Sequence, residues 1–141
     1  MGVGYMPEDR RLIGALSVED NILLPAWASR LGDGQDRLSD IYQLMPDIRD
    51  LAGRRASQLS GGQQKMAALA RALMSGTRLV LLDEPFEGLS PAMGDRLAST
   101  ILGFQRDGLS VLMAESDSKR IAFAQTVYTI ERGEIVELAG R

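Results

Sequence analysis

The chain contains no cysteine and no histidine among its 141 residues. Without cysteine it can form neither a disulfide nor a thiolate metal site, which is compatible with a reducing cytosol. Without histidine it has no imidazole for acid–base catalysis, and it lacks the commonest protein ligand of transition metals. These two absences exclude imidazole catalysis and most transition-metal chemistry.

Long apolar runs and basic clusters are also scarce. No stretch approaches the roughly 18 apolar residues of a membrane-spanning helix, and the first residues lack the pattern of a secretory signal, so we expect neither feature. The formal net charge is −3, and the 16 Lys and Arg residues are scattered, with short doublets such as Arg10-Arg11 and Arg54-Arg55. Because nucleic-acid binding normally needs a basic face, we expect no nucleic-acid partner.

The first half of the chain predicts one short strand followed by helices. The apolar segment 2–6 is a strand candidate, and the charged segment 8–16 is expected to be a loop. Ser17 and Asp20 resemble a capping box, which marks the start of a helix. The predicted helices cover residues 17–29, 36–45 and 60–75.

The second half predicts alternating strands and helices. Residues 79–82 form a continuous apolar run, which is typical of a buried parallel strand, and residues 109–114 form a second one. Ser90-Pro91 is a good cap and first-turn pair for a helix that continues to about residue 105. The remaining expected elements are a short helix over 117–124 and a terminal hairpin with strands at 126–130 and 134–138.

This order of elements predicts an α/β fold. An irregular helical part over about residues 17–76 precedes an α/β part over about 77–141, which holds parallel strands and the terminal β-hairpin.

The segment Leu59-Ser60-Gly61-Gly62-Gln63 lies at the predicted start of the third helix. Two glycines there leave backbone N–H groups unblocked, and the helix dipole adds positive potential. With the Ser60 hydroxyl as a further donor, the segment predicts a small anion-binding cradle. The alternative is a flexible linker with an ordinary N-cap, in which Gln63 occupies the capping-box position.

Two acids, Asp83 and Glu84, follow the apolar run at 79–82. The carboxyl ends of buried strands are where ligands bind in open α/β sheets. The alternative is a strand-to-loop corner with two exposed acids, closed by Pro85. The order and spacing of these acids and of the segment 59–63 favour the functional interpretation of both motifs.

Together, these motifs resemble the second half of an ABC-type ATPase nucleotide-binding domain. The resemblance runs nearly end to end, from Glu8 to the closing turn at Gly133, but no Gly-x-x-x-x-Gly-Lys-Ser/Thr loop occurs in the chain. The implied fold is therefore a partial P-loop NTPase domain that lacks the phosphate-loop half. We expect the strand of that half to lie beside the strand ending at Asp83. Without it, we expect open strand edges, an uncovered apolar face and marginal stability.

The resemblance also implies a role for each motif. Residues Ser60 to Gln63 would press on the γ-phosphate of ATP held by a partner domain. Asp83 would hold Mg²⁺, and Glu84 would be the catalytic base that polarises the attacking water. Glu8 occupies the place of a glutamine that contacts Mg²⁺ in most members.

Two departures from the usual family pattern make the chain resemble one subfamily more than the others. Ser90 replaces an aspartate that couples the two sites of a dimer, and Ser116 lies at or near the position of a histidine that contacts the γ-phosphate. The branched-chain amino-acid uptake ATPases are similar in lacking the aspartate and often the histidine. They also often read Val-Pro-Glu-Gly-Arg where this chain reads Met6-Pro7-Glu8-Asp9-Arg10.

The function implied is that of an ATP-hydrolysing subunit of an importer for branched-chain amino acids or a related solute. Its cofactors would be ATP and Mg²⁺. Its partners would be a second ABC ATPase domain and permease subunits, at the cytoplasmic face of the membrane. Because the phosphate loop is missing, we expect the chain alone to bind ATP weakly and to be inactive.

Two alternatives remain open. The chain could be a non-catalytic partner subunit that supplies Ser60 to Gln63 in trans to a complete ATPase. It could also come from an ABC-type ATPase of DNA repair or translation, which the acidic net charge and the lack of a heptad run disfavour.

Overall fold

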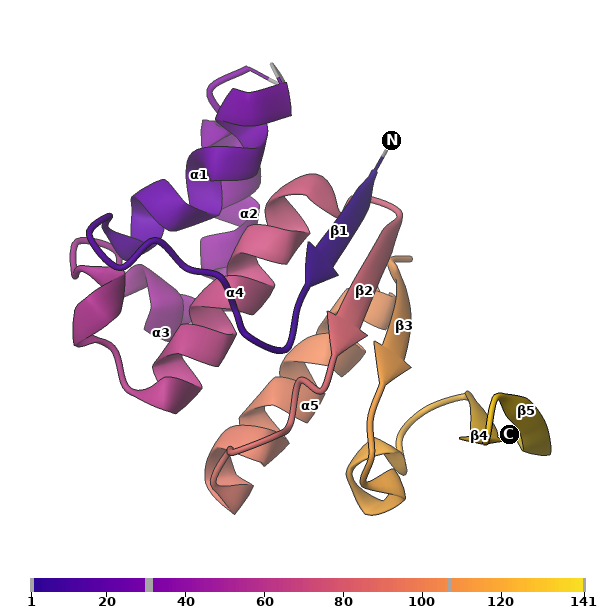
Figure 1. The fold of residues 1–141 in the computed structure, drawn as a ribbon. Coiled ribbons are helices and arrows are strands. Elements are labelled where there is room, and N and C mark those ends of the chain that lie inside the picture. Colours follow the sequence, from indigo (N-terminus) through magenta and orange to yellow (C-terminus); the bar gives the residue numbers. More distant parts are fainter. Residues whose placement is uncertain (1, 30–31, 107, 141) are drawn as a thin grey trace.

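A computed structural model describes residues 2–29, 32–106 and 108–140. It contains a three-stranded sheet, a separate two-stranded hairpin, and helices that lie mainly on the side of β1 away from β3 (Figure 1). This arrangement confirms the predicted α/β class with parallel strands and a terminal hairpin. The elements are β1 (Val3–Met6), α1 (Val18–Ser29), α2 (Gln35–Leu44), α3 (Pro46–Arg49), η1 (Ala56–Gln58), α4 (Gly61–Ser75), β2 (Leu79–Asp83), α5 (Pro91–Arg106), β3 (Ser110–Ala114), η2 (Ser118–Ile121), β4 (Thr126–Glu131) and β5 (Glu134–Gly140).

The strand ending at Asp83 is the central strand of the three-stranded sheet. β2 pairs in parallel with β1 on one side and with β3 on the other, so that Leu81 lies opposite both Tyr5 and Leu112. Both hydrogen-bonding edges of β2 are therefore occupied. The expectation that the phosphate-loop strand lies beside β2 is wrong, because β1 and β3 occupy its two edges. An additional strand could pair only with the outer edge of β1 or of β3.

The two faces of this sheet differ in burial. On one face, Met6, Val80 and Leu82 are buried, and α4 packs against β1 while α5 packs against β3. On the other face, Tyr5 is 54% exposed and Leu112 is 60% exposed. The prediction that residues 109–114 form a buried strand is therefore wrong for this face, because no described element covers it. The expected uncovered apolar face is confirmed.

α4 is the central helix of the molecule and begins and ends as predicted. The backbone N–H of Gln63 donates to Oγ of Ser60 at 3.3 Å, and the backbone N–H of Ser60 donates to Oε1 of Gln63 at 3.0 Å. Gly76 is its C-cap. A Cβ atom at Gly4 would lie 1.9 Å from the carbonyl oxygen of Ala72, so β1 and α4 are in direct backbone contact.

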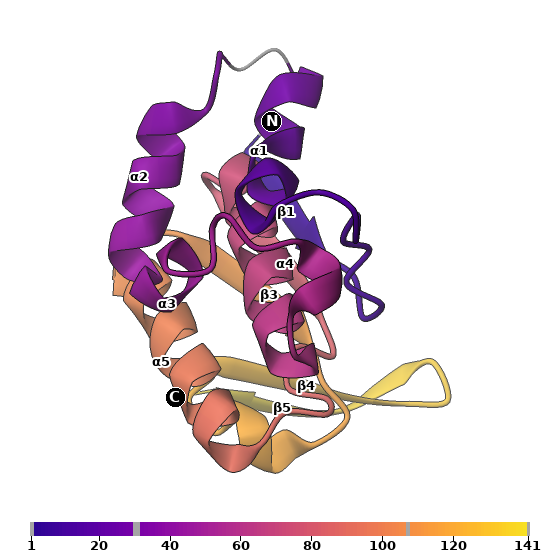
Figure 2. The same ribbon diagram turned by 90° about the vertical axis from the view of Figure 1, so that its left-hand side faces the viewer.

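The helices α1, α2 and α3 are grouped around α4 (Figure 2). The backbone N–H of Asp20 donates to Oγ of Ser17 at 3.0 Å, which confirms the predicted start of α1. The second predicted helix is α2, and Pro46 begins the short helix α3, which the sequence did not predict. Within the described ranges, no helix is both long and apolar enough for a membrane span.

The C-terminal elements differ in one respect from the prediction. The hairpin is confirmed, and its turn residues Arg132 and Gly133 both have positive φ angles, 51° and 85°. The predicted helix at 117–124 is instead the 3₁₀ turn η2, in which the N–H of Arg120 donates to the carbonyl of Asp117. The hydrogen bond of this turn joins residues three positions apart, as in a 3₁₀ helix, whereas an α-helix joins residues four positions apart.

Candidate functional site

The predicted anion cradle lies at the N-terminus of α4. Ser60 and Gly61 are exposed there, and a Cβ atom at Gly61 would meet only the end of the Arg10 side chain, at 3.7 Å. At Gly62 a Cβ would lie 3.2 Å from Cε of Met93, so this second glycine packs on α5. Close packing on Met93 therefore explains why residue 62 is a glycine, but no such packing explains the glycine at 61. The lack of a side chain at Gly61 leaves the backbone there accessible to a ligand.

The loop that contains Glu8 folds over this helix terminus. Nη1 of Arg10 donates to Oε1 of Gln64 at 2.8 Å. Arg10 and Arg11 both have left-handed backbones, with φ of 63° and 47°. The guanidinium of Arg71 on α4 donates to the carbonyls of both residues and holds them in this conformation. Nothing in the sequence identified Arg71 as a contact of this loop.

The carboxyl end of β2 presents the two predicted acids. Asp83 is the last residue of the strand, and the hydroxyl of Tyr5 on the neighbouring strand donates to its Oδ2 at 3.3 Å. Glu84 follows with a left-handed backbone, φ 44°, and its N–H donates to the carbonyl of Ala114 at 2.9 Å. Strained residues of this kind cluster at functional sites, where the surroundings hold them in place.

Ser116 contacts the carboxylate of Glu84 directly. Its hydroxyl donates to Oε2 at 3.2 Å and its backbone N–H donates to the same oxygen at 3.3 Å. The structure thus brings together two predicted site residues from the ends of β2 and β3. Two donors on one oxygen orient the carboxylate of Glu84.

Lys65 reaches the same corner from α4. Its side chain is 1% exposed, and its Nζ donates to the backbone carbonyl of Glu84 at 2.5 Å. Burial lowers the pKa of Lys65, although the nearby charge of Glu87 opposes this effect. The sequence gave no signal for this contact, because a lysine in an amphipathic helix is ordinarily solvent-exposed.

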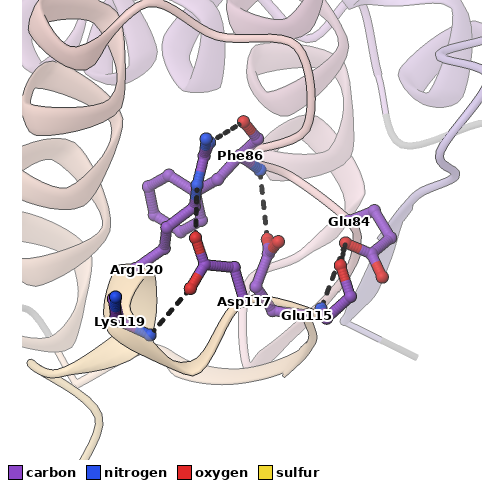
Figure 3. A network of polar contacts seen from close by, with 7 residues as sticks. Glu84, Phe86, Glu115, Asp117, Lys119 and Arg120 are labelled. Atoms are coloured by element: carbon purple, nitrogen blue, oxygen red, sulfur yellow. Dashed lines mark hydrogen bonds and ion pairs between the residues drawn. The ribbon is translucent and has the colours of Figure 1, made fainter.

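Glu115 and Arg120 both hydrogen-bond to the backbone of Phe86 in the loop after Glu84 (Figure 3). The N–H of Phe86 donates to Oε2 of Glu115 at 3.2 Å, and the guanidinium of Arg120 donates to the carbonyl of Phe86. Arg120 also pairs with Asp117 at 3.3 Å. Burial, followed by a hydrogen bond to Glu84, raises the pKa of Glu115.

Glu8 lies close to the strand-end acids. The charge of Glu87 is the main cause that raises the pKa of Glu8, and the charges of Asp83 and Glu84 act in the same direction. Carboxylate oxygens are the ligands that Mg²⁺ prefers, and a cation would relieve this repulsion. Among the described residues, however, no three acids are close enough to form a metal site by themselves. Water and phosphate oxygens would have to complete the coordination of Mg²⁺.

Ser90 has a structural role that the sequence predicted. Its Oγ accepts a hydrogen bond from the N–H of Met93 at 3.4 Å, and its carbonyl accepts one from Gly94 at 2.9 Å, so that it caps α5. Ser90 makes no described hydrogen bond to Glu84 or Ser116. The candidate site thus comprises a corner around Glu84 and the N-terminus of α4, which Lys65 connects.

A helix N-terminus open to anions, next to carboxylates at the end of a parallel strand, defines a nucleotide-binding α/β protein. The family model for the ABC transporter matches residues 1–87, which is more than half of the chain. The chain therefore belongs to the ABC transporter family, as the motifs predicted. Members of this family bind ATP together with Mg²⁺.

Two kinds of curated relatives are similar to the chain. One is the high-affinity branched-chain amino acid transport ATP-binding protein BraG of Pseudomonas aeruginosa, which is 33% identical over 95% of this chain and 58% of its own length. Another is the probable branched-chain amino acid transport ATP-binding protein LivF of Archaeoglobus fulgidus, which is 28% identical over 96% of this chain and 58% of its own length. The macrolide export protein MacB of Psychrobacter arcticus is 34% identical over 94% of this chain but only 20% of its own. The chain thus spans less than two thirds of the length of each relative.

Solved structures establish the fold independently. The ADP conformation of MJ1267, an ATP-binding cassette of an ABC transporter, superposes with a TM-score of 0.84 at 20% identity, over 99% of this chain and 61% of that one. The dimeric structure of MJ0796, a bacterial ABC transporter cassette, superposes with a TM-score of 0.84 at 24% identity, over 97% and 62%. The fold is that of part of an ABC ATPase cassette.

Proposed function

We propose that the chain is part of the ATP-hydrolysing subunit of an ABC importer for branched-chain amino acids or a related small solute. The observation that carries this proposal is the corner at Glu84, where a carboxylate at the end of β2 is oriented by Ser116. The names of the BraG and LivF relatives support the class of solute, and so does the Pro7-Glu8 segment. MacB acts in export, but the chain covers only 20% of it.

In this proposal each site residue has one role. Glu84 accepts a proton from water as the water oxygen attacks the γ-phosphorus, and the bond from that phosphorus to the ADP oxygen breaks. Asp83 and Glu8 would hold Mg²⁺, which would neutralise phosphate charge when bound. Residues Ser60 to Gln63 contact the γ-phosphate of an ATP molecule held by another domain, chiefly through the Ser60 hydroxyl and the N–H groups of Gly61 and Gly62, since the N–H of Gln63 donates to Ser60.

The proposed partners follow from this division of the site. A second ABC ATPase domain would face the N-terminus of α4, and permease subunits would place the pair at the cytoplasmic face of a membrane. We also propose that residues 17–76 act as the subdomain that carries the cradle, and that 77–141 act as the part that carries Glu84. The phosphate loop would come from residues outside this sequence or from a partner chain.

A gene sequence and an activity assay test this proposal. The DNA read in frame upstream of the first codon should encode a strand followed by Gly-x-x-x-x-Gly-Lys-Ser/Thr. In the protein that contains both halves, Glu84→Gln should lower kcat by at least about 100-fold with little change in KM, because the base acts only in the transition state. Glu131→Gln in the exposed hairpin is the control and should leave kcat unchanged. Equal activity of Glu84→Gln and the native protein would contradict the proposal.

The complete cradle and the missing phosphate loop also favour a second function, that of a non-catalytic partner. A stop codon upstream would favour this alternative. The chain would then raise the hydrolysis rate of a complete ABC ATPase when mixed with it, and Ser60→Arg would remove the increase by blocking the helix terminus. In either case the 141-residue chain alone should bind Mg-ATP weakly in calorimetry. A micromolar affinity would contradict that expectation.

A further inference from the structure

Two polar side chains, Asn21 and Lys65, are completely buried among the described residues. The fold accounts for Asn21, because its side chain exchanges hydrogen bonds with the backbone of Ile13 and also donates to Ser17. Lys65 is different, because a buried ammonium is costly and its described hydrogen bond goes only to the carbonyl of Glu84. That carbonyl belongs to the residue proposed as the catalytic base.

The backbone of Glu84 is held on both sides. Its N–H donates to Ala114 on β3, and its carbonyl accepts from Lys65 on α4. Since φ at Glu84 is 44°, this residue is in a conformation that a non-glycine residue adopts only when its surroundings enforce it. Lys65 is the part of those surroundings that comes from the helix carrying the anion cradle.

We propose that Lys65 is a positioning residue, which fixes the backbone of Glu84 and makes its placement depend on the position of α4. The inference rests on the proposed function, because it assumes that Glu84 is the base. Lys65 lies five residues after Ser60, which is about 7 Å along the helix axis. A shift of α4 when its N-terminus meets a phosphate would therefore reach Glu84 through this hydrogen bond.

The charges around Lys65 explain why a lysine suits this position. Its ammonium lies near the carboxylates of Glu87, Glu115 and Glu84, which favour the charged form, whereas Arg10 disfavours it. A charged donor makes a stronger hydrogen bond to a carbonyl than a neutral one. Methionine at this position has nearly the same length but no donor, and it would leave the carbonyl of Glu84 with only the backbone N–H of Glu87, at 3.2 Å, as a donor.

Amide hydrogen exchange of the full chain tests the contact. In Lys65→Met, the Glu84 amide should exchange about tenfold faster than in the native chain, because its hydrogen bond to Ala114 opens more often. Lys65→Gln, which retains a donor, should restore most of the protection. Lys119→Met, the same change at an exposed site, is the control and should have no effect. Equal exchange of Glu84 in the native chain and Lys65→Met would overturn the proposal.

A spectroscopic measurement on the native chain decides the question if Lys65→Met fails to fold. The ammonium of Lys65 should give a slowly exchanging ¹H–¹⁵N signal with a scalar coupling to the carbonyl carbon of Glu84. An ammonium that exchanges as fast as those of surface lysines would overturn the proposal.

Activity provides the readout that a purely structural role would not change. In the ATPase that contains both halves, Lys65→Met should lower kcat about tenfold, with KM for ATP within about twofold, since Lys65 contacts neither water nor nucleotide. Lys65→Gln should recover most of the rate. An unchanged kcat would overturn the positioning role. If the native assembly itself lacks activity, the proposed function fails, while hydrogen exchange still decides the contact of Lys65 with Glu84.

Discussion

The hydroxyl and the backbone N–H of Ser116 both donate to one carboxylate oxygen of Glu84, at 3.2 Å and 3.3 Å. The resemblance predicts that Ser116 lies at or near the position of a family histidine, and in this chain it contacts the acid. The loop after β3 therefore orients the acid after β2 by two hydrogen bonds.

Removal of the Ser116 hydroxyl should slow hydrolysis without affecting the fold. In the protein that contains both halves, we expect Ser116→Ala to lower kcat about fivefold, since one hydrogen bond contributes about 1 kcal/mol. The free energy of unfolding should change by less than about 0.5 kcal/mol, because the side chain is exposed. Steady-state kinetics and urea unfolding measure both. Ser118→Ala is the matched control, and a native kcat in Ser116→Ala would show that the contact is not used.

Two glycines should respond in opposite ways to alanine. Gly4→Ala should destabilise the chain by about 3 kcal/mol or more, because the new Cβ would lie 1.9 Å from the carbonyl oxygen of Ala72. Gly61→Ala should change stability by no more than about 0.5 kcal/mol, because its Cβ would meet only Arg10 at 3.7 Å. Gly53→Ala, where nothing lies within 4 Å, is the control for urea unfolding.

The Gly61→Ala variant also tests whether Gly61 is needed for ligand binding rather than for folding. If Gly61 is there to let a phosphate approach, Gly61→Ala should fold normally and yet lose ATPase stimulation in mixtures with a complete ABC ATPase. Full stimulation by Gly61→Ala would mean that the α4 N-terminus does not approach the nucleotide closely.

Glu115 should make stability depend on pH. Because its pKa is raised in the folded chain, first by burial and then by Glu84, the folded state holds its proton over a range where the unfolded state has lost it. Stability should therefore fall as pH rises from the ordinary glutamate pKa, about 4.3, through the raised folded value. Glu115→Gln should remove this decline and be more stable than the native chain at neutral pH. Urea unfolding at several pH values measures the effect, with Glu137→Gln as an exposed control.

Local chemistry explains which parts of the fold were predictable. The caps at Ser17, Ser60 and Ser90 involve residues a few positions apart, so the sequence alone identified them. The position of β1 beside β2 depends on pairing between residues more than 70 positions apart, which no local pattern contains. The expectation that the phosphate-loop strand lies beside the strand ending at Asp83 failed for this reason.

The candidate site was predictable to a similar extent. Motifs identified Glu84, Asp83 and Ser60, because each belongs to a short pattern with its own chemistry. They gave no sign of Lys65 or Arg71, whose side chains extend from α4 to distant backbone carbonyls. Such contacts follow from the packing of the helix on the sheet, which determines where a long side chain ends.

The uncovered face of the sheet should make the isolated chain associate. Leu112 on β3 is 60% exposed there and Tyr5 on β1 is 54% exposed, and the outer edges of β1 and β3 lack a strand partner in the described structure. Leu112→Lys should reduce association in light scattering while changing the free energy of unfolding by less than about 0.5 kcal/mol. Leu44→Lys, the same change on exposed α2, should not reduce it. A native chain that is monodisperse and unfolds in one sharp thermal transition would contradict this expectation, because an open apolar sheet face would then be stable in water.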